Sequence, residues 1–272
     1  MIRAPATAKI NLALVVGPPR PDGKHELATV YQRVALADRV AVEPSDALRV
    51  VGFAADTIVR RALQSLAAEA GTEPAWRVRL TKRIPLAAGL GGGSSDAATA
   101  LRLANGTLAD PLPADRLHAL AATIGADVPF FLANGPQLGV ADGAELAPLE
   151  LPQDFAVLLL IPNGTAKVST AAVYQAFDAR WGADGFDERR RGLLDALQRV
   201  RQAEDLALLP RNDLASSEHS ARLEELGAFR ADVTGAGPAV YGLFLDTGRA
   251  REAARALRST GRGIVTTACW YG

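Results

Sequence analysis

The sequence predicts a two-domain α+β protein. Segments that alternate like strands and segments with the spacing of amphipathic helices follow one another in an order that does not repeat. A stretch spaced by proline and glycine, Gln137 to Pro152, interrupts this pattern and precedes a new apolar run. With 272 residues, the chain is long enough to form two domains. We therefore expect an N-terminal domain at residues 1–150 and a C-terminal domain at residues 151–272.

Residues 8–16 alternate and predict the first strand. The large apolar side chains of this segment point one way, whereas Lys9 and Asn11 share the opposite face. A turn-forming cluster rich in proline and glycine follows at residues 17–23. The next apolar segment, residues 31–42, is expected to be extended as well.

A helix and a strand are expected to lead into a glycine-rich loop. Asp56 can cap a helix whose apolar residues repeat every three or four positions and which Gly71 ends. Residues 76–81 then alternate and predict a strand that feeds the loop. Two further helices are predicted, the first beginning directly after the glycines and running to Asn105, the second at about residues 114–124.

Beyond residue 150 the pattern mixes strands and helices. The apolar run Phe155 to Ile161 predicts a strand. Helices are expected at about residues 169–180, 188–203, 217–226 and 248–258. Further strands are expected at residues 229–233, 239–245 and 264–270, with the glycine-containing segment 234–237 between the first two.

The composition is that of a globular protein, 49% hydrophobic and 22% charged. Thirty Lys and Arg residues balance thirty Asp and Glu residues, which argues against a general nucleic-acid or membrane-surface binder. No apolar run reaches the ~18 residues that span a bilayer. Residues 1–9 lack the apolar core of a signal peptide. The single cysteine, Cys269, excludes an internal disulfide. A cytoplasmic protein with no nucleic-acid or membrane partner is therefore expected.

The glycine-rich loop is the strongest functional signal in the sequence. Four glycines within five residues, 89–93, are followed by Ser94 and Ser95 and then by an alanine-rich helical pattern. Glycine lets a ligand approach backbone N–H groups closely. The start of a helix adds unpaired N–H donors and the positive end of the helix dipole. Together these features predict an anion site suited to phosphate.

Two familiar phosphate loops do not fit this segment. No lysine follows the glycines, as the P-loop requires, and the glycine spacing differs from the dinucleotide fingerprint G-x-G-x-x-G/A. A flexible linker or a tight turn is the plainer interpretation, but linkers rarely stop at a helix start.

Four segments together identify a family resemblance. They are Ala8–Leu12 (AKINL), Pro85–Ala98 (PLAAGLGGGSSDAA), Gly125–Pro129 (GADVP) and Thr234–Val240 (TGAGPAV). In this order they resemble the galactokinase, homoserine kinase, mevalonate kinase and phosphomevalonate kinase superfamily. Within it, the long glycine motif, the segment 21–27 (PDGKHEL) and the segment 211–214 (RNDL) resemble the kinases that act on a cytidine diphosphate-linked methylerythritol.

The resemblance implies an N-terminal domain like ribosomal protein S5 domain 2, a ferredoxin-like C-terminal domain, and an active site between them. It implies ATP and Mg²⁺ as cofactors, with Lys9 and Asp127 as the catalytic pair. Asp127 would be the base and Lys9 its partner, and either Ser94 or Ser95 would lie near Mg²⁺. The implied nucleotide-binding residues are Pro85, Leu86, Ala87, Ala88, Gly89, Leu90, Gly91, Gly92, Gly93, Ser94 and Ser95.

The resemblance also implies a pocket for the small-molecule acceptor. Its implied residues are Asn11, His25, Tyr31, Tyr174, Gly235 and Gly237, with His25, Tyr31 and Tyr174 around the cytosine. Lys24 stands where members of the family often carry tyrosine, and the segment 141–145 lacks an expected Gly-Glu pair. Both departures concern the acceptor and leave the phosphate loop untouched.

Plainer interpretations stand beside each role. Asp127 could only form a turn, Lys9 could be a solvated side chain, and Asn11 could bond to neighbouring backbone. Gly235 and Gly237 could only permit a tight connection, and the two tyrosines could be core residues. For the whole chain, the alternatives are a homoserine or mevalonate kinase, or a catalytically silent sensor of nucleotides or metabolites.

Overall fold

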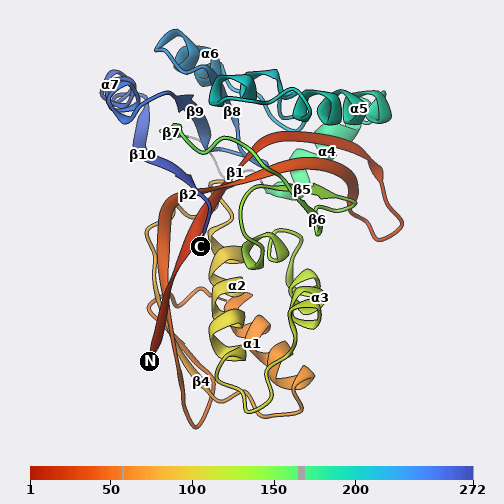
Figure 1. The fold of residues 1–272 in the computed structure, drawn as a ribbon, viewed down its shortest axis with the longest axis vertical. Helices are drawn as coiled ribbons and strands as arrows, with labels where there is room; N and C mark the ends of the chain where they lie inside the picture. The colour runs from red at the N-terminus through yellow and green to blue at the C-terminus, as the bar shows by residue number, and fades with distance from the viewer. Residues whose placement is uncertain (57, 165–168, 272) are drawn as a thin grey trace.

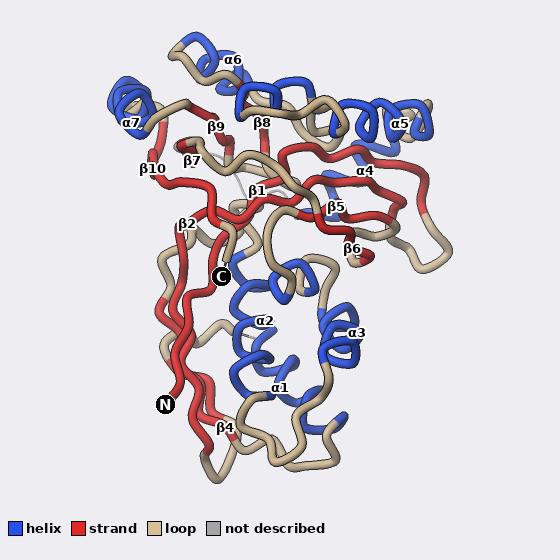
Figure 2. Tube along the Cα trace, in the orientation of Figure 1, coloured by secondary structure: helices blue, strands red, loops and turns tan. Residues whose placement is uncertain are grey.

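The computed structural model describes residues 1–56, 58–164 and 169–271. Strands and helices mix as the sequence predicts, and two long strands run through the middle of an elongated molecule (Figure 1). The α+β class is confirmed. Helices α1, α2 and α3 lie beside one half of the long strands, and the other helices lie at the opposite end (Figure 2).

The first two strands, β1 (Ile2–Pro19) and β2 (His25–Pro44), pair antiparallel along almost their whole length. They are longer than the sequence pattern indicated. The register shifts between Thr7 and Ala8, where β2 carries extra residues. Such an irregularity bends and twists a strand pair. Ala6 packs into one hydrophobic core and Ala8 into a second, so the two strands serve both halves of the molecule.

The N-terminal core lies between the sheet and three helices. Asp56 caps the first helix as predicted, accepting hydrogen bonds from the backbone N–H groups of Val59 (3.2 Å) and Arg60 (3.2 Å). Apolar side chains of the first two helices pack on the inner face of the sheet. The elements of this half are β3 (Arg49–Val51), β4 (Trp76–Thr81), α1 (Ile58–Glu69), α2 (Gly92–Asn105), α3 (Ala114–Ile124) and the 3₁₀ turn η1 (Pro129–Leu132).

The proline- and glycine-spaced stretch holds a hairpin that the sequence pattern did not predict. Strands β5 (Gln137–Val140) and β6 (Glu145–Pro148) pair with each other, and β5 also pairs with β2. Each strand has only four residues, too few for alternation to be recognisable. The hairpin places Asp142 and Gly143 against the β2 strand that carries Tyr31.

The C-terminal half is a four-stranded antiparallel sheet in the order β10-β7-β9-β8. Side chains of β7 alternate between a core with α6 and α7 and a core with α5 and β1. Burial on both faces explains why this strand is a continuous apolar run. The elements are β7 (Ala156–Pro162), β8 (Arg230–Val233), β9 (Val240–Phe244), β10 (Gly261–Cys269), α4 (Thr170–Ala179), α5 (Phe186–Leu197), α6 (Glu218–Glu225), α7 (Thr247–Ala256) and the 3₁₀ turn η2 (Ala203–Leu208).

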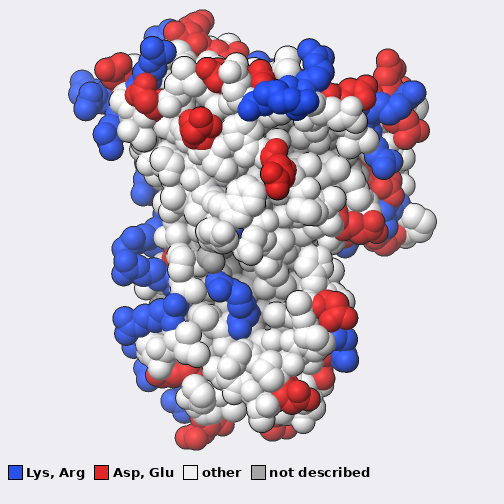
Figure 3. Space-filling model, viewed as in Figure 1, with Lys and Arg blue, Asp and Glu red and all other residues white. Residues whose placement is uncertain are grey.

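The predicted boundary near residue 150 falls between β6 and β7 and stays a prediction. β10 also pairs with β2 at residues 268 and 269, which joins the two sheets. Charges of both signs are spread around the rim of the face in Figure 3, and its centre is mostly uncharged. In the described ranges, no helix is both long enough and apolar enough to cross a bilayer.

Candidate active site

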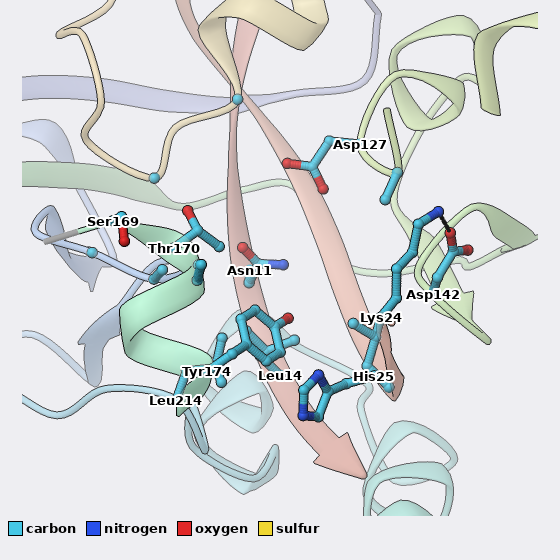
Figure 4. A pocket seen from close by; sticks show the side chains of 18 of the residues that line it. Asn11, Leu14, Lys24, His25, Asp127, Asp142, Ser169, Thr170, Tyr174 and Leu214 are labelled. Carbon is cyan, nitrogen blue, oxygen red and sulfur yellow. Dashed lines mark hydrogen bonds and ion pairs between the residues drawn. The ribbon is translucent and has the colours of Figure 1, made fainter. Parts of the chain in front are cut away.

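A cavity of about 720 Å³ lies where the two halves meet. Its walls come from β1, β2, the glycine-rich loop, α4 and the segments that precede η1 and follow β8. Figure 4 shows Asn11 and Asp127 pointing into its middle. The predicted site residues that line it are Lys9, Asn11, His25, Tyr31, Ala87, Gly89, Gly91, Ser94, Asp127, Tyr174, Gly235 and Gly237.

The Lys9 ammonium group lies 3.5 Å from Asp127 Oδ2. It also donates a hydrogen bond of 2.6 Å to Asn11 Oδ1, from the same face of β1. Lys9 is 4% exposed, whereas the Asp127 side chain is 32% exposed to the cavity. The Asn11 amide donates in turn to Thr29 Oγ1 (2.7 Å). The lysine is thereby held in place while the carboxylate stays accessible, an arrangement suited to a base with a fixed cationic partner.

The glycine-rich loop is clamped between β1 and the segment after β8. The Lys9 N–H group donates to the Leu90 carbonyl (3.0 Å), and the Ala239 N–H group donates to the Ala88 carbonyl (3.2 Å). The Thr234 hydroxyl accepts a hydrogen bond from the Asn11 N–H group (3.1 Å). Thr234 belongs to the fourth motif, but its role as a bridge was not predicted. These contacts bring three motifs that are distant in the sequence to one point.

Two glycines of the loop are required by the structure. Gly91, the N-cap of α2, has φ +69°, and a Cβ there would lie 2.9 Å from Phe131 and 3.0 Å from Lys9. Gly89 has φ +78°, and a Cβ there would collide with the Thr234 carbonyl oxygen. Both conformations favour glycine. The N-cap Gly91 supplies no side-chain cap, so it leaves the N–H donors of the first turn of α2 uncapped.

A second cavity of about 250 Å³ is lined almost entirely by this loop and the start of α2. Ser94 borders both cavities, as do Ala87, Gly89 and Gly91, so the loop and the first turn of α2 contribute to both. Ser95 borders neither, and its buried hydroxyl has no hydrogen-bond partner in the part of the chain that the structure describes. The predicted residues that line the smaller cavity are Pro85, Leu86, Ala87, Ala88, Gly89, Leu90, Gly91, Gly92, Gly93 and Ser94.

His25 and Tyr174 form a ring pair at the end of the large cavity away from the loop. Their ring centroids lie 4.7 Å apart. His25 Nε2 lies 2.9 Å from Asp178 Oδ1, a partner on α4 that the sequence analysis missed. Burial raises the pKa of Tyr174 to about 12, and Asp127 contributes. The predicted cytosine residues His25 and Tyr174 are thus brought together, with a carboxylate fixing the imidazole.

Tyr31 lies nearer the proposed base. Its hydroxyl donates a hydrogen bond of 3.1 Å to Asp127 Oδ1. Its ring stacks on Phe130, with centroids 4.8 Å apart. Tyr31 is only 3% exposed, so its ring belongs to the core, which is one of the two interpretations that the sequence left open. Tyr31 nevertheless lines the cavity.

Lys24 and Asp142 close one side of the cavity (Figure 4). Their ion pair, 2.5 Å from Nζ to Oδ2, joins the start of β2 to the turn between β5 and β6. Burial would raise the pKa of Asp142, but the hydrogen bond from Lys24 and a backbone N–H group outweigh it and lower the pKa. Lys24 and the segment 141–145, the two places where the sequence departs from the family pattern, are therefore in direct contact. Inspection of either segment alone could not reveal this.

A buried ionic cluster links the segment before the glycine loop to the first turns of α2. Lys82 contacts Asp38 and, at 2.5 Å, Asp96 Oδ2 in the first turns of α2. Asp38 also accepts a hydrogen bond from the Ile84 N–H group (2.9 Å). Burial raises the pKa of Asp96 to about 7, against the opposing effect of Lys82. Burial alone would lower the pKa of Lys82, but Asp96 and Asp38 outweigh it and raise it.

The sequence matches two family models. GHMP kinases N terminal domain matches residues 57–135, and GHMP kinases C terminal matches residues 221–263. Fold, site and motifs define a GHMP kinase. A 4-diphosphocytidyl-2-C-methyl-D-erythritol kinase of Geobacter metallireducens is 35% identical over 94% of this chain and 93% of the relative. One of Streptomyces coelicolor is 36% identical over 96% of this chain and 92% of the relative. The chain belongs to the 4-diphosphocytidyl-2-C-methyl-D-erythritol kinase family.

Solved structures agree with this assignment. A crystal structure of 4-(cytidine 5'-diphospho)-2C-methyl-D-erythritol kinase is similar at a TM-score of 0.78, with 35% identity over 98% of this chain and 99% of the other. A crystal structure of mevalonate kinase is similar at a TM-score of 0.75 with only 14% identity, covering 98% and 99% of the two chains, and shows the fold alone.

Proposed function

We propose that this protein transfers the γ-phosphoryl group of ATP to the 2-hydroxyl of 4-diphosphocytidyl-2-C-methyl-D-erythritol, in non-mevalonate isoprenoid precursor biosynthesis. The observation that carries the proposal is the Lys9–Asp127 pair, whose charged groups lie 3.5 Å apart in the cavity that the glycine-rich loop and α2 border. The chain's relatives in this family support the same assignment. Phosphoryl transfer needs a phosphate cradle, charge neutralisation and a group that orients the attacking hydroxyl. Each has a counterpart in the cavity.

The phosphates of ATP are assigned to the loop between Pro85 and Ser95. The clamped glycines and the uncapped N-terminus of α2 support this assignment. The smaller cavity continues from the loop toward Ile58 and Lys82 and offers room for the rest of the nucleotide.

Asp127 is assigned as the base and Lys9 as its partner. The acceptor O–H bond breaks and its proton passes to the Asp127 carboxylate. An oxygen lone pair forms the new bond to the γ-phosphorus, while the bond to the bridging oxygen breaks and its electron pair leaves on ADP. The Lys9 ammonium offsets negative charge on the transferring group. Since the transition state is loose, positioning and electrostatics contribute most of the rate enhancement.

Mg²⁺ is assigned to the start of α2, beside the ATP phosphates. No cluster of three His, Cys, Asp or Glu side chains suited to a metal occurs among the residues described here. Mg²⁺ commonly binds through substrate phosphates and a few protein oxygens. Ser94, which borders both cavities, is compatible with that mode, whereas the buried and unpartnered Ser95 hydroxyl would have to turn toward the phosphates to take part. Bound there, the ion would neutralise phosphate charge.

The acceptor is assigned to the larger cavity. His25, Tyr31 and Tyr174 are proposed to border the cytosine, with His25 fixed by Asp178. Asn11, Gly235 and Gly237 border the end near Asp127 and are proposed to contact the reacting part of the acceptor. At about 720 Å³, the cavity falls in the size range of small-molecule sites.

The finer fold and location belong to the same proposal. The N-terminal half would be a domain like ribosomal protein S5 domain 2, and the C-terminal half a ferredoxin-like domain. The antiparallel order β10-β7-β9-β8 with α6 and α7 on one face supports the second. A cytoplasmic location is proposed from the family.

Release of ADP with three candidate acceptors tests the function. 4-Diphosphocytidyl-2-C-methyl-D-erythritol should support turnover, whereas homoserine and mevalonate should not. Turnover with homoserine or mevalonate alone would assign the chain to a sister activity. Nucleotide binding without ADP release with any of the three would indicate a silent sensor.

A further inference from the structure

Tyr31 of β2 packs against the segment that follows Asp127. Its ring stacks on Phe130 at an interplanar angle of 26°, and Phe130 lies in η1, three residues after Asp127. The Arg33 guanidinium, two residues further along β2, donates to the Phe130 carbonyl (3.0 Å). β2 therefore fixes both the ring and the backbone of the turn that follows Asp127.

The two carboxylate oxygens of Asp127 meet different partners. Tyr31 Oη donates to Oδ1 at 3.1 Å, and Lys9 Nζ lies 3.5 Å from Oδ2. The partners come from neighbouring strands, since Asn11 of β1 lies opposite Tyr31 of β2 in the register. Burial raises the pKa of Tyr31 well above 10.0, and Asp127 raises it further. The hydroxyl thus keeps its proton at neutral pH and remains a donor.

The β5–β6 hairpin leaves space where Tyr31 passes. A Cβ at Gly139 would lie 2.6 Å from the Tyr31 ring, and a Cβ at Gly143 would lie 2.6 Å from Tyr31 Oη. A side chain at either position would push the ring or the hydroxyl from its place. The two glycines thereby allow the hydroxyl to reach Asp127.

We infer that Tyr31 is a positioning residue for phosphoryl transfer, acting through Asp127, an inference that rests on the function proposed above. With Lys9 on one oxygen and Tyr31 on the other, rotation of the carboxylate is restricted. A base held in one orientation loses less entropy when the acceptor hydroxyl arrives. The hydroxyl of Tyr31 thus serves the base, while its ring forms part of the cavity wall.

Tyr31→Phe removes only the hydroxyl and tests this role. A hydrogen bond to a charged group contributes about 1.5–3 kcal/mol, which corresponds to a fall in kcat of about 10- to 160-fold. The KM values for ATP and for the acceptor should stay within about twofold, because the ring remains. A raised acceptor KM with unchanged kcat would instead assign the hydroxyl to acceptor binding and overturn the inference.

A double-mutant cycle with Asp127→Asn separates action through Asp127 from an independent effect. Single-turnover rates are measured by rapid quench for wild type, Tyr31→Phe, Asp127→Asn and the double variant. If Tyr31 acts through Asp127, its substitution should change the rate of the Asp127→Asn variant by less than about twofold. Equal fold losses in both backgrounds would contradict the inference.

Tyr174→Phe is the matched control, because it removes a hydroxyl from the same cavity without a hydrogen bond to Asp127 among the described contacts. Its effect on acceptor KM should be the same in both backgrounds. Gly143→Ala gives a second variant, because its methyl group would lie 2.6 Å from Tyr31 Oη, although its φ of +99° also disfavours alanine. It should lower kcat by a larger factor in the wild-type background than in the Tyr31→Phe background, where the contact with the hydroxyl is absent. A wild-type protein that phosphorylates none of the acceptors would refute the proposed function itself, an outcome distinct from an additive cycle.

Discussion

At the scale of single residues, the site depends on one ion pair between distant segments. Lys9 on β1 and Asp127 before η1 come within 3.5 Å of each other although 118 positions separate them in the sequence. The lysine is buried and hydrogen-bonded to Asn11, so its positive charge is held at a fixed position beside the carboxylate. The carboxylate is the accessible partner and is therefore the group that can receive a proton.

Replacing Asp127 by asparagine should abolish most turnover and leave the rest of the protein intact. Loss of a general base typically lowers the rate by ~10²–10⁴-fold. Asparagine keeps the shape of the side chain and Lys9 keeps its hydrogen bond to Asn11, so the Asp127→Asn variant should still fold and bind ATP. Steady-state ADP release and calorimetric ATP titration check both expectations. Turnover equal to that of wild type would remove Asp127 from the mechanism.

His25→Ala and Tyr174→Ala should weaken acceptor binding alone. Stacking on a base contributes roughly 1–3 kcal/mol, so each variant should raise the acceptor KM at least several-fold. The KM for ATP should be nearly unchanged, because neither side chain lines the smaller cavity. His118→Ala, on α3 outside both cavities, is the control and should match wild type. The pocket assignment would be wrong if both variants bound the acceptor normally.

At the scale of elements, the glycine loop and α2 act as one unit. Backbone hydrogen bonds from Lys9 of β1 and from Ala239 hold the loop, and the Asp38–Lys82–Asp96 cluster holds the start of α2. A buried ion pair is costly to break because one charge is then left without its partner. The cluster therefore holds the helix start at a set position relative to the sheet.

Gly91→Ala should weaken ATP binding. The added methyl group would meet Phe131 and Lys9 at about 3 Å, and the left-handed backbone at φ +69° disfavours alanine. Calorimetry should show a loss of ATP affinity larger than the loss of acceptor affinity. Gly106→Ala is the matched control, because Gly106 at the other end of α2 has φ −67° and ordinary clearance. Unchanged ATP affinity in a folded Gly91→Ala protein would mean that the loop does not hold the phosphates.

Asp96 should make folding stability depend on pH between about 4 and 7. Its pKa rises from an ordinary 3.8 to about 7 in the folded protein, chiefly through burial. The folded state therefore binds this proton more tightly than the unfolded state. The stabilisation from this group is complete below pH 3.8 and is lost as the pH rises to about 7.

Urea unfolding of wild type and Asp96→Asn at a series of pH values measures this effect. The unfolding free energy of wild type, relative to that of the variant, should fall from pH 4 to 7 and then level off. Asp110→Asn, at an exposed side chain beyond the end of α2, serves as the control and should follow wild type. A constant difference between wild type and Asp96→Asn over this range would show that Asp96 does not titrate there.

At the scale of the whole molecule, β1 and β2 connect the halves, and the site lies where they pass from one core to the other. The sequence was sufficient for the α+β class and for most helices, because their apolar periodicity is local. It was also sufficient to single out Lys9, Asp127 and the glycine loop, because each lies in a motif. The β5–β6 hairpin was missed, since its four-residue strands carry too little pattern.

Contacts between distant segments account for the rest of what sequence inspection missed. The Lys24–Asp142 pair and the Asp38–Lys82–Asp96 cluster each join segments that only the folded chain brings together. Tyr31 was associated with the cytosine by resemblance, and only the folded chain, which brings the segment before η1 beside β2, reveals its hydrogen bond to Asp127. Long-range pairing of polar side chains leaves no periodic signal in a sequence.

The most direct test of the central claim is the position of the transferred phosphate, measured by proton-coupled ³¹P NMR of the product. The 2-hydroxyl of the acceptor sits on a carbon that carries a methyl group and no hydrogen. The new phosphomonoester should therefore appear as a resonance without three-bond coupling to a proton. A doublet or triplet would place the phosphate on a carbon that bears hydrogen and contradict the proposed transfer, and the absence of any new phosphomonoester would contradict kinase activity toward this acceptor.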